Sequence, residues 1–224
     1  MKMITRTLPF ISLCIMVSCL PAAAIAQAPL TNMIFDDQEL LDGYTKKYSD
    51  FSKETLLAMI KDNTLTPYRS AAAVRVFQKK YSEEVVSNEK RKIEKILLRR
   101  LHRTDSPFVQ VEIMYTLCQM DRYRYFKSMA PALTQKLNHY NATVNENAFN
   151  RLNKLIDSGS NRHQEARIIF NTLRKILFLS RKRLEAVKEP DPPLAMKLKL
   201  LRWSIKVLGN QELKKLPKEV IKLL

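Results

Sequence analysis

The sequence is poor in glycine, with only 3 among its 224 residues, where average usage of about 7% would give about 16. Gly43, Gly159 and Gly209 lie far apart. Phosphate-binding loops of the Walker and dinucleotide types need several glycines within a few residues, so nucleotide-dependent enzymes of those two classes are excluded. Scarce glycine also disfavours a sheet-rich fold with many tight hairpins. A largely helical fold remains.

Motifs that carry catalysis or bind metals are also missing. Ser87 and Lys90 match a Ser-x-x-Lys pattern by spacing alone. Counted from Asp37, the acidic segment has Asp42 at the position where a calcium loop needs glycine and Tyr48 where it needs glutamate. No two histidines share one helical face at metal-ligand spacing, since they stand at His102, His139 and His163. We therefore predict no enzyme, no cofactor and no metal site. An enzyme whose site gathers distant residues is the alternative.

Acidic residues are few relative to basic ones. The chain has 39 Lys and Arg against 22 Asp and Glu, a formal charge of +17, and 46% of its residues are hydrophobic. That hydrophobic share is too high for a disordered basic tail, so we expect a packed core. The charge has two interpretations. It is either a solvated surface or a binding surface for an anionic lipid, an acidic polymer, an acidic protein or nucleic acid.

The N-terminus has the three-part pattern of a secretory signal peptide. Two basic residues precede an apolar run at 8–20, and small residues follow it. Two small-x-small triplets compete, and we predict cleavage after Ala26 because the other site would place Pro29 directly after the cleaved bond. We therefore expect a signal peptide at 1–26, a periplasmic or secreted protein, and no transmembrane span after cleavage.

Cysteine is scarce, with 3 residues in the chain. Cys14 and Cys19 lie inside the expected signal peptide, which leaves Cys118 without a partner for an internal disulfide. Two alternatives to cleavage stay open: lipidation of Cys19 at a loose lipobox, and a retained membrane anchor over 8–26. Helical spacing places Cys118 among apolar residues, which predicts a small buried side chain rather than a reactive thiol.

From residue 44 onward, apolar residues recur at three- and four-residue spacing, the period of an amphipathic helix. Helices with Pro in the first turn are expected to begin at Pro67, Pro107 and Pro193, because the missing N–H costs nothing there. A fourth is expected where Thr143 and Glu146 have capping-box spacing. These starts lie 36 to 50 residues apart, a period typical of stacked helical hairpins.

A first helix precedes each of these starts. We expect the first helices at 54–61, 89–103, 131–140 and 163–189, and a closing helix at 211–224. Residues 27–43 are interpreted as a lead-in with one short helix, and 44–224 as the repeat domain. The predicted fold is all-α, a right-handed α-solenoid of about four stacked helical hairpins. A helical bundle of another topology is the alternative.

The turn from His102 to Pro107 resembles the inter-helix turn of HEAT repeats, which often ends in Asp or Pro. On these residues, the region at about 50–210 is similar to the HEAT and armadillo-like α-solenoid superfamily. The Val-Arg pair that usually follows the turn is matched only approximately, by Tyr68 and Arg69, and the fourth repeat is long. The resemblance implies an architecture of stacked helix pairs more than an activity.

Four basic residues recur every seven positions in the last long helix expected, at Arg167, Arg174, Arg181 and Lys188. At 3.6 residues per turn, this spacing keeps them within about 60° of one another, as a row beside the apolar stripe. Further basic clusters occur at 90–103 and 197–206. The row is a candidate binding site for an anionic group or partner, and a solvated surface is the alternative.

A second candidate site interleaves arginine with aromatic residues, at Arg122, Tyr123 and Arg124. Such a cluster can stack on rings and bind an anion, although core packing of Tyr123 explains it as well. A nucleic-acid partner is disfavoured by the signal peptide, because an exported protein rarely meets a chromosome.

These observations predict an exported, non-catalytic helical-repeat scaffold that binds a protein partner in the bacterial envelope through its concave face. The alternative is a basic module that binds an anionic envelope polymer or lipid. The two differ in salt dependence, because salt screens exposed charge contacts.

Overall fold

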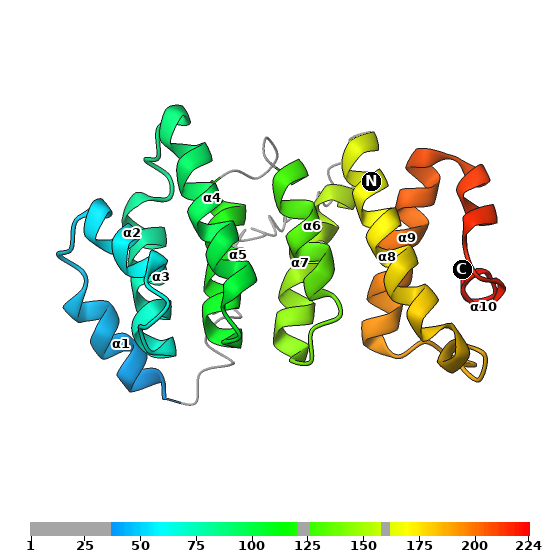
Figure 1. Ribbon diagram of the computed structural model, residues 1–224, viewed down its shortest axis with the longest axis horizontal. Helices are drawn as coiled ribbons and strands as arrows, with labels where there is room; N and C mark the ends of the chain where they lie inside the picture. The colour runs from blue at the N-terminus through cyan, green and yellow to red at the C-terminus, as the bar shows by residue number, and fades with distance from the viewer. Residues whose placement is uncertain (1–36, 121–125, 158–161) are drawn as a thin grey trace, which may run out of the picture.

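The computed structural model describes residues 37–120, 126–157 and 162–224. The expected signal peptide at 1–26 and the cluster of Arg122, Tyr123 and Arg124 lie outside these residues. The helices of the described residues, in chain order (Figure 1), are α1 (Gln38–Lys47), α2 (Lys53–Lys61), α3 (Pro67–Tyr81), α4 (Ser87–Arg103), α5 (Pro107–Met120), α6 (Phe126–Lys136), α7 (Ala142–Asp157), α8 (His163–Leu184), α9 (Pro192–Leu208), the 3-10 helix η2 (Asn210–Lys215) and α10 (Lys218–Ile221).

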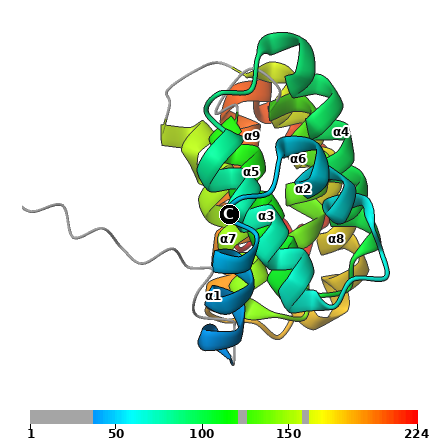
Figure 2. The ribbon, with the colours of Figure 1, turned by 90° about the vertical axis from the view of Figure 1, so that its left-hand side faces the viewer.

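The helices lie in two layers. Helices α2, α4, α6 and α8 form one layer, and α3, α5, α7 and α9 form the other (Figure 2). Consecutive helices form four contacting pairs: α2 with α3, α4 with α5, α6 with α7, and α8 with α9. Each helix also contacts the equivalent helix of the next pair. At the two ends, α1 packs against α3, while η2 contacts α9 and α10 contacts α8. Consecutive pairs therefore bury their apolar faces against one another.

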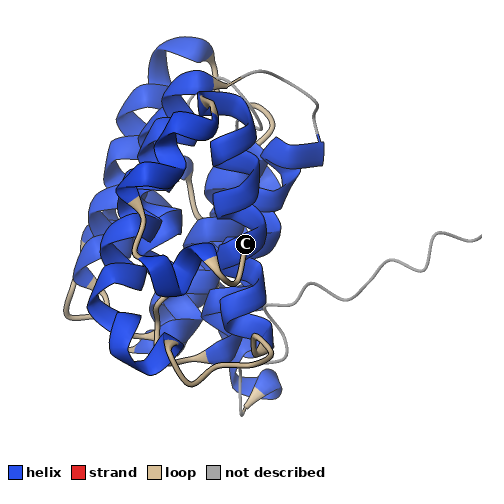
Figure 3. Ribbon diagram, turned by 90° about the vertical axis from the view of Figure 1, so that its right-hand side faces the viewer, coloured by secondary structure: helices blue, strands red, loops and turns tan. Residues whose placement is uncertain are grey.

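All regular structure in the described residues is helical, with no strand among them (Figure 3). This confirms the all-α prediction made from scarce glycine and from the apolar period. Within the same ranges, no helix has both the length and the apolar character needed to cross a bilayer.

Proline stands at the start of the second helix in three of the four pairs. Helices α3 and α5 start at Pro67 and Pro107, as predicted. Helix α9 starts at Pro192, one residue earlier than predicted, because Asp191 caps it: the Asp191 Oδ1 atom accepts a hydrogen bond of 2.8 Å from the Leu194 N–H. The local sequence therefore determines these boundaries to within one residue.

The capping box predicted at Thr143 is wrong. Helix α7 begins at Ala142, and the Asn141 Oδ1 atom accepts a hydrogen bond of 3.2 Å from the Val144 N–H. Asn is at least as good an N-cap as Thr. The Asn145 side chain adds bonds to both the N–H and the C=O of His139. These contacts favour a helix that starts at Ala142, three residues after His139, rather than at Thr143.

Three helices differ in length from the prediction. Helix α1 crosses the expected boundary between lead-in and repeat domain at residue 43. Helix α6 covers Phe126–Lys136 instead of 131–140, with Pro131 inside it rather than at its start. Helix α8 ends at Leu184 instead of 189, and the Val187 N–H donates to the Leu184 carbonyl in the turn that follows.

The closing helix predicted at 211–224 is also wrong. The 3-10 helix η2 and the short helix α10 occupy this region. Pro217 separates them, because it has no N–H to donate and its predecessor Leu216 is extended, with φ −97° and ψ 150°. Gly209 lies between the end of α9 and the start of η2 and allows the chain to change direction there, because its φ of 104° is one that other residues rarely adopt.

The core runs through both layers. Phe77 of α3, Leu133 of α6 and Phe170 of α8 are fully buried. Cys118 of α5 is also buried, and burial raises the pKa of its thiol to about 11. The thiol therefore stays protonated and unreactive at neutral pH, which confirms the prediction of a small packing residue.

Candidate functional site

Helix α8 presents an apolar face to the core and a mixed face to solvent. Ile169, Leu173 and Leu177 are buried where α8 contacts α6 and α9, because helical spacing places them on one stripe. Phe178 and Leu179 lie outside this stripe, with exposed fractions of 50% and 83%. Adjacent large apolar side chains in solvent mark a candidate contact surface.

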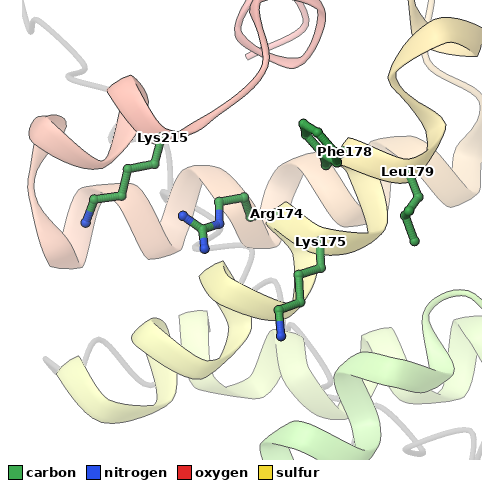
Figure 4. A pocket seen from close by; sticks show the side chains of 5 residues that line it. All are labelled: Arg174, Lys175, Phe178, Leu179 and Lys215. Carbon is green, nitrogen blue, oxygen red and sulfur yellow. The ribbon is translucent and has the colours of Figure 1, made fainter.

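These two side chains line a groove of about 520 Å³, which we call the α8 groove. Its other lining residues are Arg174 and Lys175 of α8 and Lys215 of η2. Figure 4 shows Arg174 extending from α8 towards Lys215, with Phe178 and Leu179 farther along the helix. The groove therefore combines an apolar surface with three cations.

A buried carboxylate holds one wall of the groove. Glu212 of η2 is 2% exposed; it accepts hydrogen bonds of 2.6 Å from the Arg167 Nη1 atom and 2.9 Å from the Lys215 Nζ atom. The bond from Lys215, followed by the contact with Arg167, holds the pKa of Glu212 below its ordinary value against the opposing effect of burial. Glu212 thus ties α8 to η2 and offsets part of the charge there.

The remaining cations of the groove have no such partner. Within the described part of the chain, Arg174 and Lys175 form no ion pair with a carboxylate. Arg181, one turn beyond Phe178, lies over its ring at 4.2 Å from the centroid and donates to the Phe178 carbonyl. This stacking supports the exposed ring of Phe178 from one side. The field at the groove is therefore positive.

The predicted basic row is only partly present. Arg167, Arg174 and Arg181 lie on α8, and each has a different environment: Arg167 binds Glu212, Arg174 lines the groove, and Arg181 covers Phe178. Lys188 is not in the row, because α8 ends at Leu184. The row therefore borders the groove with three residues rather than four.

Sequence reasoning missed the apolar part of the groove and the contribution of η2. The exposure of Phe178 and Leu179 could have been predicted, because neither residue lies on the apolar stripe that contains the buried Leu173 and Leu177. No comparable signal existed for Lys215, which reaches the groove only through the tertiary contact between η2 and α8.

The histidines and acids form no metal site in the described residues. His102 and His163 are exposed. The Nδ1 atom of His139 accepts a hydrogen bond of 3.1 Å from the Asn141 N–H, and burial, together with nearby Lys136, lowers the pKa of His139. His139 therefore organises the turn between α6 and α7 as a neutral imidazole.

Comparison of the chain with protein-family models, with curated proteins and with solved structures gave no match.

Proposed function

We propose that this protein is a non-catalytic helical-repeat scaffold that binds a protein partner in the bacterial envelope. The helix pairs would form a right-handed α-solenoid of the HEAT and armadillo-like type. The proposal is supported by the regular contacts between consecutive pairs and by the signal-peptide pattern of residues 1–26. The proposal assigns no reaction to the α8 groove, which two apolar and three cationic side chains line.

The observation that carries the proposal is the α8 groove, in which exposed Phe178 and Leu179 lie between cations. Apolar contact supplies affinity and the cations supply orientation, so the fitting partner is a segment that presents apolar and acidic side chains together. The layer of α3 and α5 offers less open surface, since residues 70–78 and 109–114 are all buried. We therefore place the proposed contact on α8 rather than on a concave face.

The test is a pull-down from envelope extract with the exported protein, washed at low and then at high salt. The wild type should retain a defined protein through the high-salt wash, and a Phe178→Ser, Leu179→Ser variant should lose it. A Val86→Ser, Tyr140→Ser variant is the matched control, because both side chains are well exposed, at 64% and 80%, and lie outside the groove. Equal retention by all three proteins would overturn the proposal.

A second candidate function is binding of an anionic envelope polymer or lipid. It is favoured by Arg174 and Lys175, which line the α8 groove without a carboxylate partner in the described residues. Release of lipid or acidic polymer by salt alone, weakened by Arg174→Gln with Lys175→Gln, would support it. Arg167 is unsuitable for this test, because its loss would also break the contact with Glu212.

A further inference from the structure

A second cationic site lies at the other end of the molecule, where Arg100 of α4 is buried without a carboxylate partner. Arg100 is 6% exposed. Its guanidinium donates to the Asn63 Oδ1 atom and, at 3.2 Å, to the Ser70 Oγ atom, and its Nε atom is buried without a hydrogen-bond partner. Both partners are neutral. A buried charge is costly without a counter-charge, and burial accordingly lowers the pKa of Arg100.

Arg100 lines a small pocket of about 130 Å³ between the ends of α2 and α4, which we call the α2–α4 pocket. Lys61 and Asn63 line it from the α2 side, and Ile96, Arg99 and Arg103 line it from α4. Its volume is about a quarter of that of the α8 groove. The pocket therefore suits a small polar group.

Four of the six residues that line the pocket are basic. Lys61, Arg99 and Arg103 are exposed, and none forms an ion pair with a carboxylate in the described residues. The closest acid in electrostatic terms is Asp62, but its Oδ1 atom already accepts bonds of 2.8 Å from the Thr64 N–H and 2.7 Å from the Thr64 hydroxyl. Asp62 therefore forms no ion pair with the four cations that line the pocket.

The helix dipole accounts for only part of this arrangement. Basic residues in the last turn of a helix interact favourably with its C-terminal carbonyls, and Arg100 and Arg103 both lie in the last turn of α4. The dipole does not account for the contacts of the Arg100 guanidinium, which bonds to Asn63, beyond the end of α2, and to Ser70 of α3. These contacts hold the guanidinium in a fixed place, and the carboxylate of Asp62 acts on its charge without forming an ion pair with it.

We propose that the α2–α4 pocket binds an oxyanion of the phosphate class, with Arg100 at its base and Lys61, Arg99 and Arg103 around it. A planar arginine fork matches the oxygens of a phosphate, and additional cations suit its double negative charge better than the single charge of a carboxylate. The small size of the pocket suits a single phosphate group. The phosphate is either free in solution or the terminal group of a lipid.

The test measures the thermal unfolding midpoint of the purified full chain with inorganic phosphate and with chloride at matched ionic strength. Phosphate at tenfold excess over its dissociation constant should raise the wild-type midpoint by about 3–6 °C. The shift should be absent in Arg100→Met and strongly reduced in Arg99→Gln with Arg103→Gln. The second variant changes only exposed side chains, so it stays informative if Arg100→Met does not fold.

The matched control is Lys182→Gln with Arg183→Gln, which removes two exposed positive charges of α8 that do not line the α2–α4 pocket. It should keep the full phosphate shift. A wild type that shows no shift at matched ionic strength would overturn the proposal, as would a shift that persists in the Arg99 and Arg103 variant.

Flotation with phosphatidylcholine vesicles, with and without phosphatidic acid, identifies the source of the phosphate. Wild-type binding to the phosphatidic acid vesicles that free phosphate displaces, and that Arg99→Gln with Arg103→Gln lacks, would assign a lipid headgroup. A phosphate-induced thermal shift without flotation would assign a soluble phosphate.

Discussion

Arg75 and Arg100 are buried to the same extent, 6% exposed each, yet their surroundings differ in charge. Arg75 of α3 donates through Nε, at 2.9 Å, and Nη2 to the Oε1 atom of Glu112, which is itself 2% exposed on α5. Arg100 donates its hydrogen bonds to the neutral groups of Asn63 and Ser70, and Asp62 acts on it through charge alone, without an ion pair. Burial alone therefore does not reveal the role of an arginine. The charge of its partner separates a structural ion pair from an open anion site.

The largest effect is expected for Glu112→Gln, which leaves Arg75 buried without its main carboxylate. Removing one partner of a buried ion pair typically costs about 3–5 kcal/mol, so denaturant unfolding should show a loss of that order. Combining Glu112→Gln with Arg75→Met should recover much of the loss, because no buried charge then remains. A loss below about 1 kcal/mol in the single variant would show that Arg75 does not depend on Glu112.

Arg100→Met should behave differently when no phosphate is present. Its hydrogen bonds to Asn63 and Ser70 are lost, but so is an uncompensated buried charge. We expect the free energy of unfolding to change by no more than about 1.5 kcal/mol, since one effect offsets the other. A loss as large as that of Glu112→Gln would make Arg100 a structural residue and remove the contrast.

Glu212 extends the comparison from buried cations to a buried anion. Arg167 and Lys215 lower its pKa below the ordinary 4.5, so in that range the unfolded chain binds more protons than the folded chain. The contribution of Glu212 to stability is thus present above about pH 4.5 and is lost as the pH falls through the lowered value. The unfolding free energy of wild type relative to Glu212→Gln, measured by denaturant titration across acid pH, should decline there. A constant difference would contradict the ion pairs.

Sequence reasoning predicted those features that neighbouring residues determine. Pro67 and Pro107 set the starts of α3 and α5 because a first-turn proline acts locally. The cap of α7 went to Asn141 instead of Thr143, where two good caps stand close together and contacts with the preceding turn decide between them. The sequence also contains the proline, Pro217, that interrupts the closing helix, but the apolar period outweighed it in the prediction.

The candidate sites were less accessible from sequence, because they depend on which side chains meet in space. Arg100 belongs to a visible basic cluster at 90–103, but nothing in that cluster distinguishes it from the exposed Arg99. Its burial arises from Asn63 and Ser70, about 30 or more residues away along the chain. The α8 groove likewise needs Lys215, which only the fold brings to α8. Charge pattern predicts where cations are dense, and packing decides which of them lack a counter-charge.

The smallest effect is expected at His139, a basic group that the fold keeps neutral, in contrast to Arg100. Burial and then the charge of Lys136 lower its pKa below the ordinary 6.5, and its Nδ1 atom accepts the Asn141 N–H. As the pH falls below 6.5, the unfolded chain takes up a proton before the folded chain does, so stability decreases. Protonation also removes one hydrogen bond, worth about 0.5–1.5 kcal/mol.

Denaturant unfolding of wild type and His139→Gln above and below pH 6.5 checks this expectation. The glutamine does not titrate, so only the wild type should lose stability as the pH falls through this range. Equal pH dependence in the two proteins would mean that the turn between α6 and α7 tolerates a charged imidazole. In that case uncompensated positive charge would be tolerated at a second place in the fold, and Arg100 would no longer stand apart from the rest of the molecule.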